Sequence, residues 1–152
     1  MIDTIDRSIL RMLQQHSKMT IKEIAGKLNL TASPVFERIK RLEKEKYITS
    51  YRAVIDRKKI GLSLLVFCNI SLIQHEATSI KKFEKDIQQF PEVIECYHIG
   101  GMSDYLIKVV AKDMDTYQYF VAKKLASVDN IRQVQSSFVM TEVKSTSDLP
   151  FS

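Results

Sequence analysis

The chain has 152 residues, of which 45% are hydrophobic and 27% are charged, and its formal net charge is +5. This composition is typical of a folded protein and excludes wholesale disorder, and the length fits one domain or two small ones. No apolar stretch reaches the roughly 18 residues of a transmembrane helix, and the opening segment MIDTIDRSIL lacks the basic and then apolar pattern of a signal sequence.

The two cysteines, Cys68 and Cys96, form no CxxC pair, and the three histidines are scattered along the chain. These residues are too few for a disulfide framework or a zinc site. We therefore expect a cytoplasmic protein that has no metal, no cofactor and no membrane partner.

The charge is unevenly distributed. Residues 1–59 hold 14 Lys or Arg against 7 Asp or Glu, whereas residues 60–152 hold 9 against 11. A basic first part joined to a slightly acidic remainder favours contact of the first part with a polyanion. The alternative is a basic surface that faces only solvent.

Up to Lys46 the apolar residues recur at helical spacing and predict three helices. Asp3 or Thr4 is the expected N-cap of the first helix, and Thr20 with Glu23 forms a capping-box pattern before the second. Pro34 falls in the first turn of the third helix, where its missing N–H costs little. The apolar positions that define the helices are Ile5, Ile9, Met12 and Leu13; Ile21, Ile24, Ala25 and Leu28; and Val35, Ile39 and Leu42.

The second and third predicted helices are separated only by Asn29-Leu30-Thr31. Asn tolerates the left-handed conformation that a tight turn needs, so the pair is typical of a helix-turn-helix. A step of about 100° per residue turns a basic and polar set outward on the third helix. This set is Ser33, Glu37, Lys40, Arg41 and Lys44. We interpret it as a face that binds double-stranded DNA, and the alternative is an amphipathic helix with a solvated face.

Residues 51–62 are interpreted as a hinge, with a short strand at Tyr51–Asp56 that is open to pairing with another copy. The chain then follows the order β, helix, β, β, helix, β. The expected segments are Leu64–Ile73, Ser79–Phe90, Val93–Ile99, Tyr105–Ala111, Met114–Leu125 and Arg132–Val143, followed by a loose tail.

This βαββαβ order is the split, ferredoxin-like arrangement of an antiparallel sheet with both helices on one face. The fold class is therefore α+β. Along Leu64–Ile73 both alternating sets of side chains are too apolar for a solvated face. We expect the uncovered face to form a homodimer or a higher homo-oligomer.

Several local motifs together carry a family resemblance. They are Asp6-Arg7-x-Ile9-Leu10, Leu30-Thr31-x-Ser33-Pro34-x-x-Glu37-Arg38-Ile39-x-Arg41-Leu42-Glu43, Ile48-x-x-Tyr51, Glu95-Cys96-x-x-x-x-Gly101-x-x-Asp104-Tyr105-Leu106 and Val139-Met140-x-Glu142-Val143-Lys144. From Asp3 to Lys144 the chain resembles the Lrp/AsnC (feast/famine) transcription regulators.

The resemblance implies a winged helix-turn-helix domain over residues 1–50, a hinge strand and linker over 51–62, a ferredoxin-like oligomerisation and effector domain (of the RAM or ACT type) over 63–145, and a tail over 146–152. It also implies dimers that assemble into tetramers or octamers. The DNA-binding residues expected from the residue pattern and the resemblance are Thr31, Ser33, Pro34, Glu37, Arg38, Lys40, Arg41 and Lys44.

The resemblance further implies an amino-acid effector, bound between dimers near the loop that joins the second and third strands. The expected effector residues are Gly100, Gly101, Met102, Ser103, Asp104, Tyr105, Ser136 and Ser137. Glycines let backbone N–H groups approach a carboxylate, and Asp104 offers an acceptor to an ammonium group. The alternative is a simple turn in which Asp104 caps a backbone amide. Met102 stands where relatives carry a polar residue, which favours an apolar effector such as leucine or methionine.

The sequence contains none of the short catalytic motifs GxSxG, HExxH, GxGxxG or the P-loop, so no enzyme is expected. One other function stays open beside an effector-responsive regulator, namely an architectural, nucleoid-type DNA-binding protein. A sharp footprint that shifts with an effector indicates the first, and uniform coating of DNA indicates the second.

Overall fold

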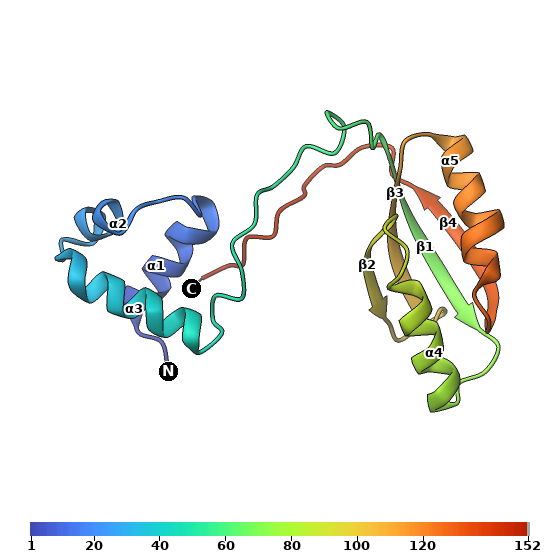
Figure 1. Cartoon of the computed structure of the whole chain (residues 1–152), viewed down its shortest axis with the longest axis horizontal. Helices are drawn as coiled ribbons and strands as arrows, with labels where there is room; N and C mark the ends of the chain where they lie inside the picture. The colour runs from blue at the N-terminus through green and yellow to red at the C-terminus, as the bar shows by residue number, and fades with distance from the viewer. Residues whose placement is uncertain (152) are drawn as a thin grey trace. The chain divides into compact units, whose positions relative to one another are not determined.

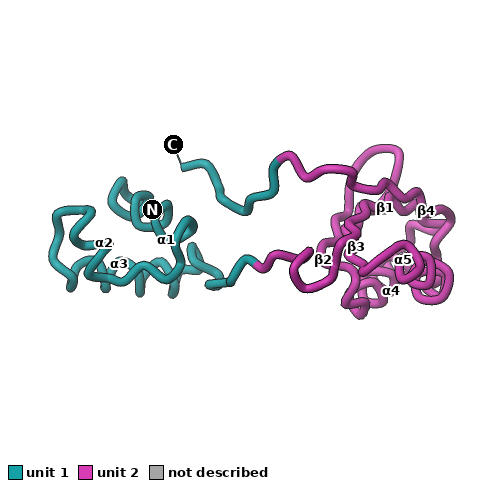
Figure 2. Tube along the Cα trace, turned by 90° about the horizontal axis from the view of Figure 1, so that it is seen from above, with its two compact units in different colours: residues 1–54, 144–152 teal, residues 55–143 magenta. Residues whose placement is uncertain are grey.

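The computed structural model describes residues 1–151, which divide into two units. One unit holds residues 1–54 together with the segment from Lys144 onward, and the other holds residues 55–143 (Figure 2). Ser152, the last residue of the expected tail, lies outside the described residues.

The first unit contains helices α1 (Thr4–Gln15), α2 (Ile21–Leu28) and α3 (Ala32–Lys44) (Figure 1). Asp3 is the N-cap of α1 and forms a capping box with Asp6. The capping box predicted at α2 is confirmed: the Thr20 N–H donates to Glu23 at 2.7 Å, and the Glu23 N–H donates to the Thr20 hydroxyl at 3.3 Å.

The turn between α2 and α3 also forms as expected. Asn29 adopts the left-handed conformation (φ 54°, ψ 41°), and the Leu30 N–H donates to the Ala25 carbonyl at 2.9 Å. Ala25 is buried where the helices meet. Thr31 takes the N-cap position of α3, but its side chain makes no capping hydrogen bond, so the buried apolar face of α3 holds this turn.

The expected loose tail is ordered against α1. Arg11 Nη2 donates to the Phe151 carbonyl and Gln14 Nε2 donates to the Leu149 carbonyl, both at 2.9 Å. The Phe151 ring packs against the apolar core of the three helices. The tail has no regular secondary structure, as expected, yet it is part of the first unit.

The short strand expected at Tyr51–Asp56 is absent from the described chain. A strand needs a hydrogen-bonded neighbour, and no segment of the described chain pairs with these residues. Their apolar side chains remain exposed, with Val54 at 95% and Ile55 at 61%. Nearby, Arg57 is held by an ion pair with Glu142 and donates to the Ser63 carbonyl at 2.7 Å.

The second unit is the expected βαββαβ module. Its strands are β1 (Leu64–Leu72), β2 (Val93–His98), β3 (Tyr105–Ala111) and β4 (Ile131–Phe138), in the antiparallel order β2-β3-β1-β4. Its helices are α4 (Ala77–Ile87) and α5 (Met114–Tyr119), and α5 continues through a π-helical and a 3-10 turn to Ser127. The final strand ends earlier than expected, at Phe138 rather than Val143.

Both helices cover one face of this sheet. Phe83 of α4 and Tyr117 and Phe120 of α5 share a core with alternate residues of β1 and β3. The opposite face carries Leu65, paired with Val110, and Phe67, paired with Lys108. Leu65 and Val110 are 5% and 6% exposed; they lie near one end of the two strands, whereas Phe67 and Lys108 lie nearer the middle.

Among residues 1–151, the longest helix falls short of the length and apolarity needed to cross a membrane.

Candidate DNA interface and effector loop

The predicted DNA-binding residues lie on α3 and at its N-terminal end. Val35, Ile39 and Leu42 are buried against α1 and α2, which turns the remaining residues away from the core. All of the predicted residues are exposed except Arg38, which is half-buried. Lys40 makes a 3.5 Å ion pair with Glu43, and within residues 1–151 Lys44 makes no ion pair.

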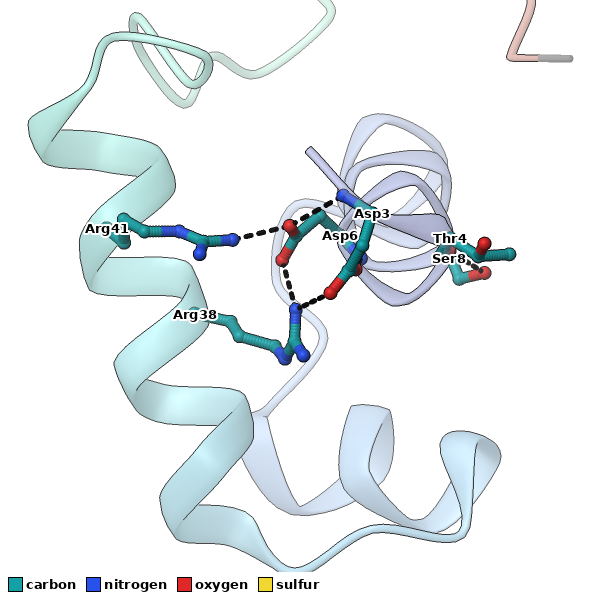
Figure 3. A network of polar contacts seen from close by, with 6 residues as sticks. All are labelled: Asp3, Thr4, Asp6, Ser8, Arg38 and Arg41. Carbon is teal, nitrogen blue, oxygen red and sulfur yellow. Dashed lines mark hydrogen bonds and ion pairs between the residues drawn. The ribbon is translucent and has the colours of Figure 1, made fainter. Parts of the chain in front are cut away.

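Two of the predicted arginines are bound to α1 (Figure 3). Arg38 Nη1 donates to Asp6 at 2.7 Å and to Asp3 at 2.6 Å, and Arg41 Nη2 pairs with the other oxygen of Asp6. Asp6 is completely buried. A buried carboxylate needs donors to offset its lost hydration, so these arginines connect α3 to α1.

The capping box adds to this network (Figure 3). The Asp6 N–H donates to Asp3 at 2.8 Å, and the Asp3 N–H donates to Asp6 at 3.0 Å. The hydrogen bond from the Asp6 amide, and then that from Arg38, lowers the pKa of Asp3. Hydrogen bonds to Asp6 and Asp3 raise the pKa of Arg38. Among residues 1–151, Ser33, Glu37, Lys40 and Lys44 make no ion pair with α1.

In the sequence analysis, no role on or beneath the α3 surface was given to the side chains of Asp6 and Phe36. The signal for Asp6 was its position on the buried side of α1, next to Ile9 and Leu10. Phe36 is apolar but lies off the buried stripe of α3. It is 41% exposed, and the Lys40 ammonium lies 5.7 Å from the centre of its ring.

The predicted effector loop joins β2 to β3. Its ends are fixed by the Ile99 N–H, which donates to the Asp104 carbonyl, and by the Asp104 N–H, which donates to the Ile70 carbonyl, both at 2.9 Å. Asp104 Oδ2 accepts the Leu72 N–H at 2.7 Å, and its Oδ1 lies 2.8 Å from His75 Nε2. The Leu72 hydrogen bond, and then His75, lowers the pKa of Asp104. Both oxygens of Asp104 are therefore engaged within the chain.

The centre of the loop is open. No atom lies within 4 Å of the space next to Gly100 or Gly101, and Gly101 has a φ of +142° that side chains disfavour. Met102 is fully exposed and Ser103 is half-buried. The side of each glycine where a side chain would stand is therefore open.

The remaining effector candidates are placed differently. Tyr105 is buried, and its hydroxyl donates to Glu84 at 2.7 Å. Ser136 pairs with Cys68 and lies 2.5 Å from the Tyr117 hydroxyl. The loop stands at the Ile70 end of β1, where β4 contributes Val134 rather than Ser136. Within one chain, Ser136 and Ser137 do not line the loop.

A cavity of about 420 Å³ lies between α4 and β2, next to the start of the loop. Its lining includes Glu84, Cys96, His98 and Tyr105, and the last two rings are stacked with their centres 4.7 Å apart. Burial raises the pKa of the Cys96 thiol, and the nearby Glu84 carboxylate adds to this effect. Among residues 1–151, no group of three or more His, Cys, Asp or Glu side chains is arranged to hold a metal ion.

A helix-turn-helix with an exposed basic third helix, joined in one chain to a βαββαβ module, defines a DNA-binding protein with a ligand-binding domain. Residues 2–49 match the winged helix-turn-helix DNA-binding model, and residues 65–149 match the Lrp/AsnC ligand binding domain. The chain belongs to the Lrp/AsnC family of transcription regulators, as its motifs predicted.

Individual relatives agree over nearly the whole length. The chain is 35% identical to the DNA-binding transcriptional activator DecR of Escherichia coli K12, over 99% of both chains. It is 31% identical to the leucine-responsive regulatory protein of the same strain, over 97% of this chain and 90% of that one. A transcriptional regulator of Neisseria meningitidis, solved in complex with L-methionine, superimposes with a TM-score of 0.95 at 31% identity, covering 99% of this chain and 97% of that one.

Proposed function

We propose that this regulator binds specific double-stranded DNA sequences as a dimer or higher homo-oligomer and responds to an amino acid. In this proposal α3 enters the major groove, with Ser33, Glu37 and Lys40 near the bases and Lys44 near a phosphate. Thr31 and Pro34 lie at the N-terminal end of α3 and contact the DNA backbone. Arg38 and Arg41 hold the orientation of α3 through Asp6.

The observation that carries the DNA part is the division of charge on α3. Two of its cations pair with Asp6 of α1 and with its N-cap Asp3, whereas among residues 1–151 Lys44 makes no ion pair and Lys40 has only a long contact with Glu43. The free cations therefore lie on the side away from the core, where a polyanion has access. Lys44→Ala is expected to weaken binding to all sequences alike and to flatten its salt dependence.

The effector part rests on the open glycine loop and on the methionine complex of the Neisseria relative. Gly100, Gly101 and Ser103 present backbone N–H groups to the effector carboxylate, and Met102 contacts an apolar side chain. Asp104 fixes the loop through Leu72 and His75. Tyr105 supports the loop from the core, and Ser136 and Ser137 contribute only from a neighbouring subunit.

The test combines DNA binding with assembly. Duplexes selected from a random library by the purified chain are titrated with and without each of the twenty amino acids, and mass is followed by analytical ultracentrifugation. We expect a selected sequence to bind more tightly than a scrambled one, and one apolar amino acid to shift both DNA affinity and mass. Affinity that no amino acid changes would contradict the effector part.

An architectural, nucleoid-type role is the second candidate, because oligomers with a basic helix also coat DNA without sequence preference. Equal affinity for selected and scrambled duplexes, with a continuous footprint, would favour that role over a specific regulator.

A further inference from the structure

Phe36 is the exposed aromatic residue on the outer part of α3. Phe36 is 41% exposed, whereas the residues of the buried face of α3 are at most 8% exposed. These buried residues are Val35, Ile39 and Leu42. Single exposed apolar residues are common on protein surfaces and need no explanation alone. What distinguishes Phe36 is its surroundings on a helix that is expected to meet DNA.

The neighbours of Phe36 on the helix surface are Ser33, three residues before it, and Lys40, four residues after it. The Lys40 ammonium lies 5.7 Å from the ring centre, at cation–π distance. This contact holds the apolar ring beside a side chain that is proposed to lie near the bases. Phe36 therefore lies next to the part of α3 that is proposed to meet base edges.

Arg38, two residues along, points to nearly the opposite side of the helix because two steps turn the chain by about 200°. Its bonds to Asp3 and Asp6 mark that side as the contact with α1 (Figure 3). Phe36 is therefore turned away from α1, and its exposed part is not explained by packing between these helices.

The major groove presents hydrogen-bond donors and acceptors on every base pair, and its one apolar group is the C5-methyl of thymine. A phenyl ring gains free energy by covering that methyl group and loses by covering a polar base edge. We propose that Phe36 reads a thymine methyl group in the target site and is a specificity-determining residue of α3. This inference rests on the proposed sequence-specific binding of DNA.

The experiment removes the methyl group from the DNA and the ring from the protein. A duplex selected from a random library is rebuilt with uracil in place of each thymine in turn. For the unmodified protein, one or two positions per half-site are expected to lose about threefold to tenfold in affinity, as for one buried methyl group. Phe36→Ala should bind the thymine and uracil duplexes equally, while Phe36→Leu should keep part of the discrimination.

Tyr47→Ala is the matched control, because Tyr47 is 45% exposed and lies just beyond the end of α3. It should leave the uracil pattern unchanged. Circular dichroism shows that each variant is folded, and the uracil scan of the unmodified protein needs no variant at all.

The possible outcomes distinguish a failure of this inference from a failure of the proposed function. If no thymine is sensitive to uracil, or if Phe36→Ala keeps the full sensitivity, the inference is wrong even though the protein binds DNA specifically. If Phe36→Ala lowers the mass of the assembly and leaves the uracil pattern intact, Phe36 belongs to a protein contact. If no sequence is selected from the library, the proposed function itself fails, and the inference fails with it.

Discussion

At the scale of single residues, the buried Asp6 is the clearest departure from a simple amphipathic helix. It is a completely buried charged side chain among residues 1–151, and it accepts hydrogen bonds from Arg38 and Arg41 and from the Asp3 amide. Arg41 is among the residues expected to bind DNA. In the structure it also pairs with Asp6 of α1, so we expect Arg41→Ala to lower stability as well.

Asp6→Ala is expected to destabilise the chain by about 3 kcal/mol, because it leaves two arginines without their buried partner and removes half of the capping box. Urea denaturation followed by circular dichroism measures the loss. Glu37→Ala, which removes an exposed carboxylate from α3, is the control and should change stability by less than about 0.5 kcal/mol. Equal effects of the two substitutions would show that the network adds nothing.

Asp104 makes a pH-dependent contribution at the loop. The Leu72 N–H, and then His75, lowers its pKa from the ordinary value of 3.8. A lowered pKa means that the stabilisation is present above about pH 4 and is lost as the pH falls through the lowered pKa. Asp104→Asn should therefore reduce hydrogen-exchange protection of the Leu72 amide at pH 6, and the difference between the two proteins should shrink as the pH falls below 3.8. A difference that grows as the pH falls below 3.8 would contradict this assignment.

At the scale of elements, the tail is the segment whose structure differs most from the loose tail that the sequence predicts. Its hydrogen bonds to Arg11 and Gln14 run through backbone atoms of Leu149 and Phe151, and the ring of Phe151 adds apolar contact with the core of the helices. Backbone bonds do not depend on the side chain, so the sequence pattern of the tail carries little sign of them.

Phe151→Ala is expected to lower the stability of the first unit by about 1–2 kcal/mol, since the ring is partly buried. Leu149→Ala is the matched control, because the Leu149 side chain is 67% exposed while its backbone makes the same kind of contact. Thermal unfolding followed at the helical circular-dichroism band compares them. Identical melting temperatures would place Phe151 outside the core of this unit.

At the scale of the whole molecule, we expect the outer face of the sheet in the second unit to mediate self-association. Leu65 and Val110 lie near one end of its strands, and Phe67, nearer the middle, lies beneath the Lys108 ammonium, 5.9 Å away. Lys108 in turn pairs with Glu95 at 3.2 Å. Such a mixture of apolar and polar side chains is usual in protein interfaces.

Residues 55–143 expressed alone are expected to sediment as a dimer or larger assembly and to show no DNA binding, because the basic α3 is absent from this fragment. Phe67→Lys should shift the fragment to monomer, while Gln118→Lys, a change at an exposed position of α5 on the other side of the sheet, should not. A fragment that is monomeric before any substitution would refute assembly through this sheet face.

The helices, their caps and the left-handed Asn29 follow from residues within a few positions of one another, and the order of the strands follows from local alternation. That is why the sequence by itself determined the fold class, the helix-turn-helix and the family. The strand expected at Tyr51–Asp56 does not form within the described chain, because the pattern supplies a side-chain alternation but no partner for the backbone.

Only the tertiary structure decided which charged and apolar groups meet. Arg41 and Asp6 are 35 residues apart in the sequence, and Arg11 and Phe151 are 140 apart. Judged from the sequence of its own helix alone, each of the two arginines, Arg41 and Arg11, is expected to be a solvated cation. Pairing across such distances depends on how the helices pack, and this packing buries Asp6 beside α3, where Arg38 and Arg41 pair with it.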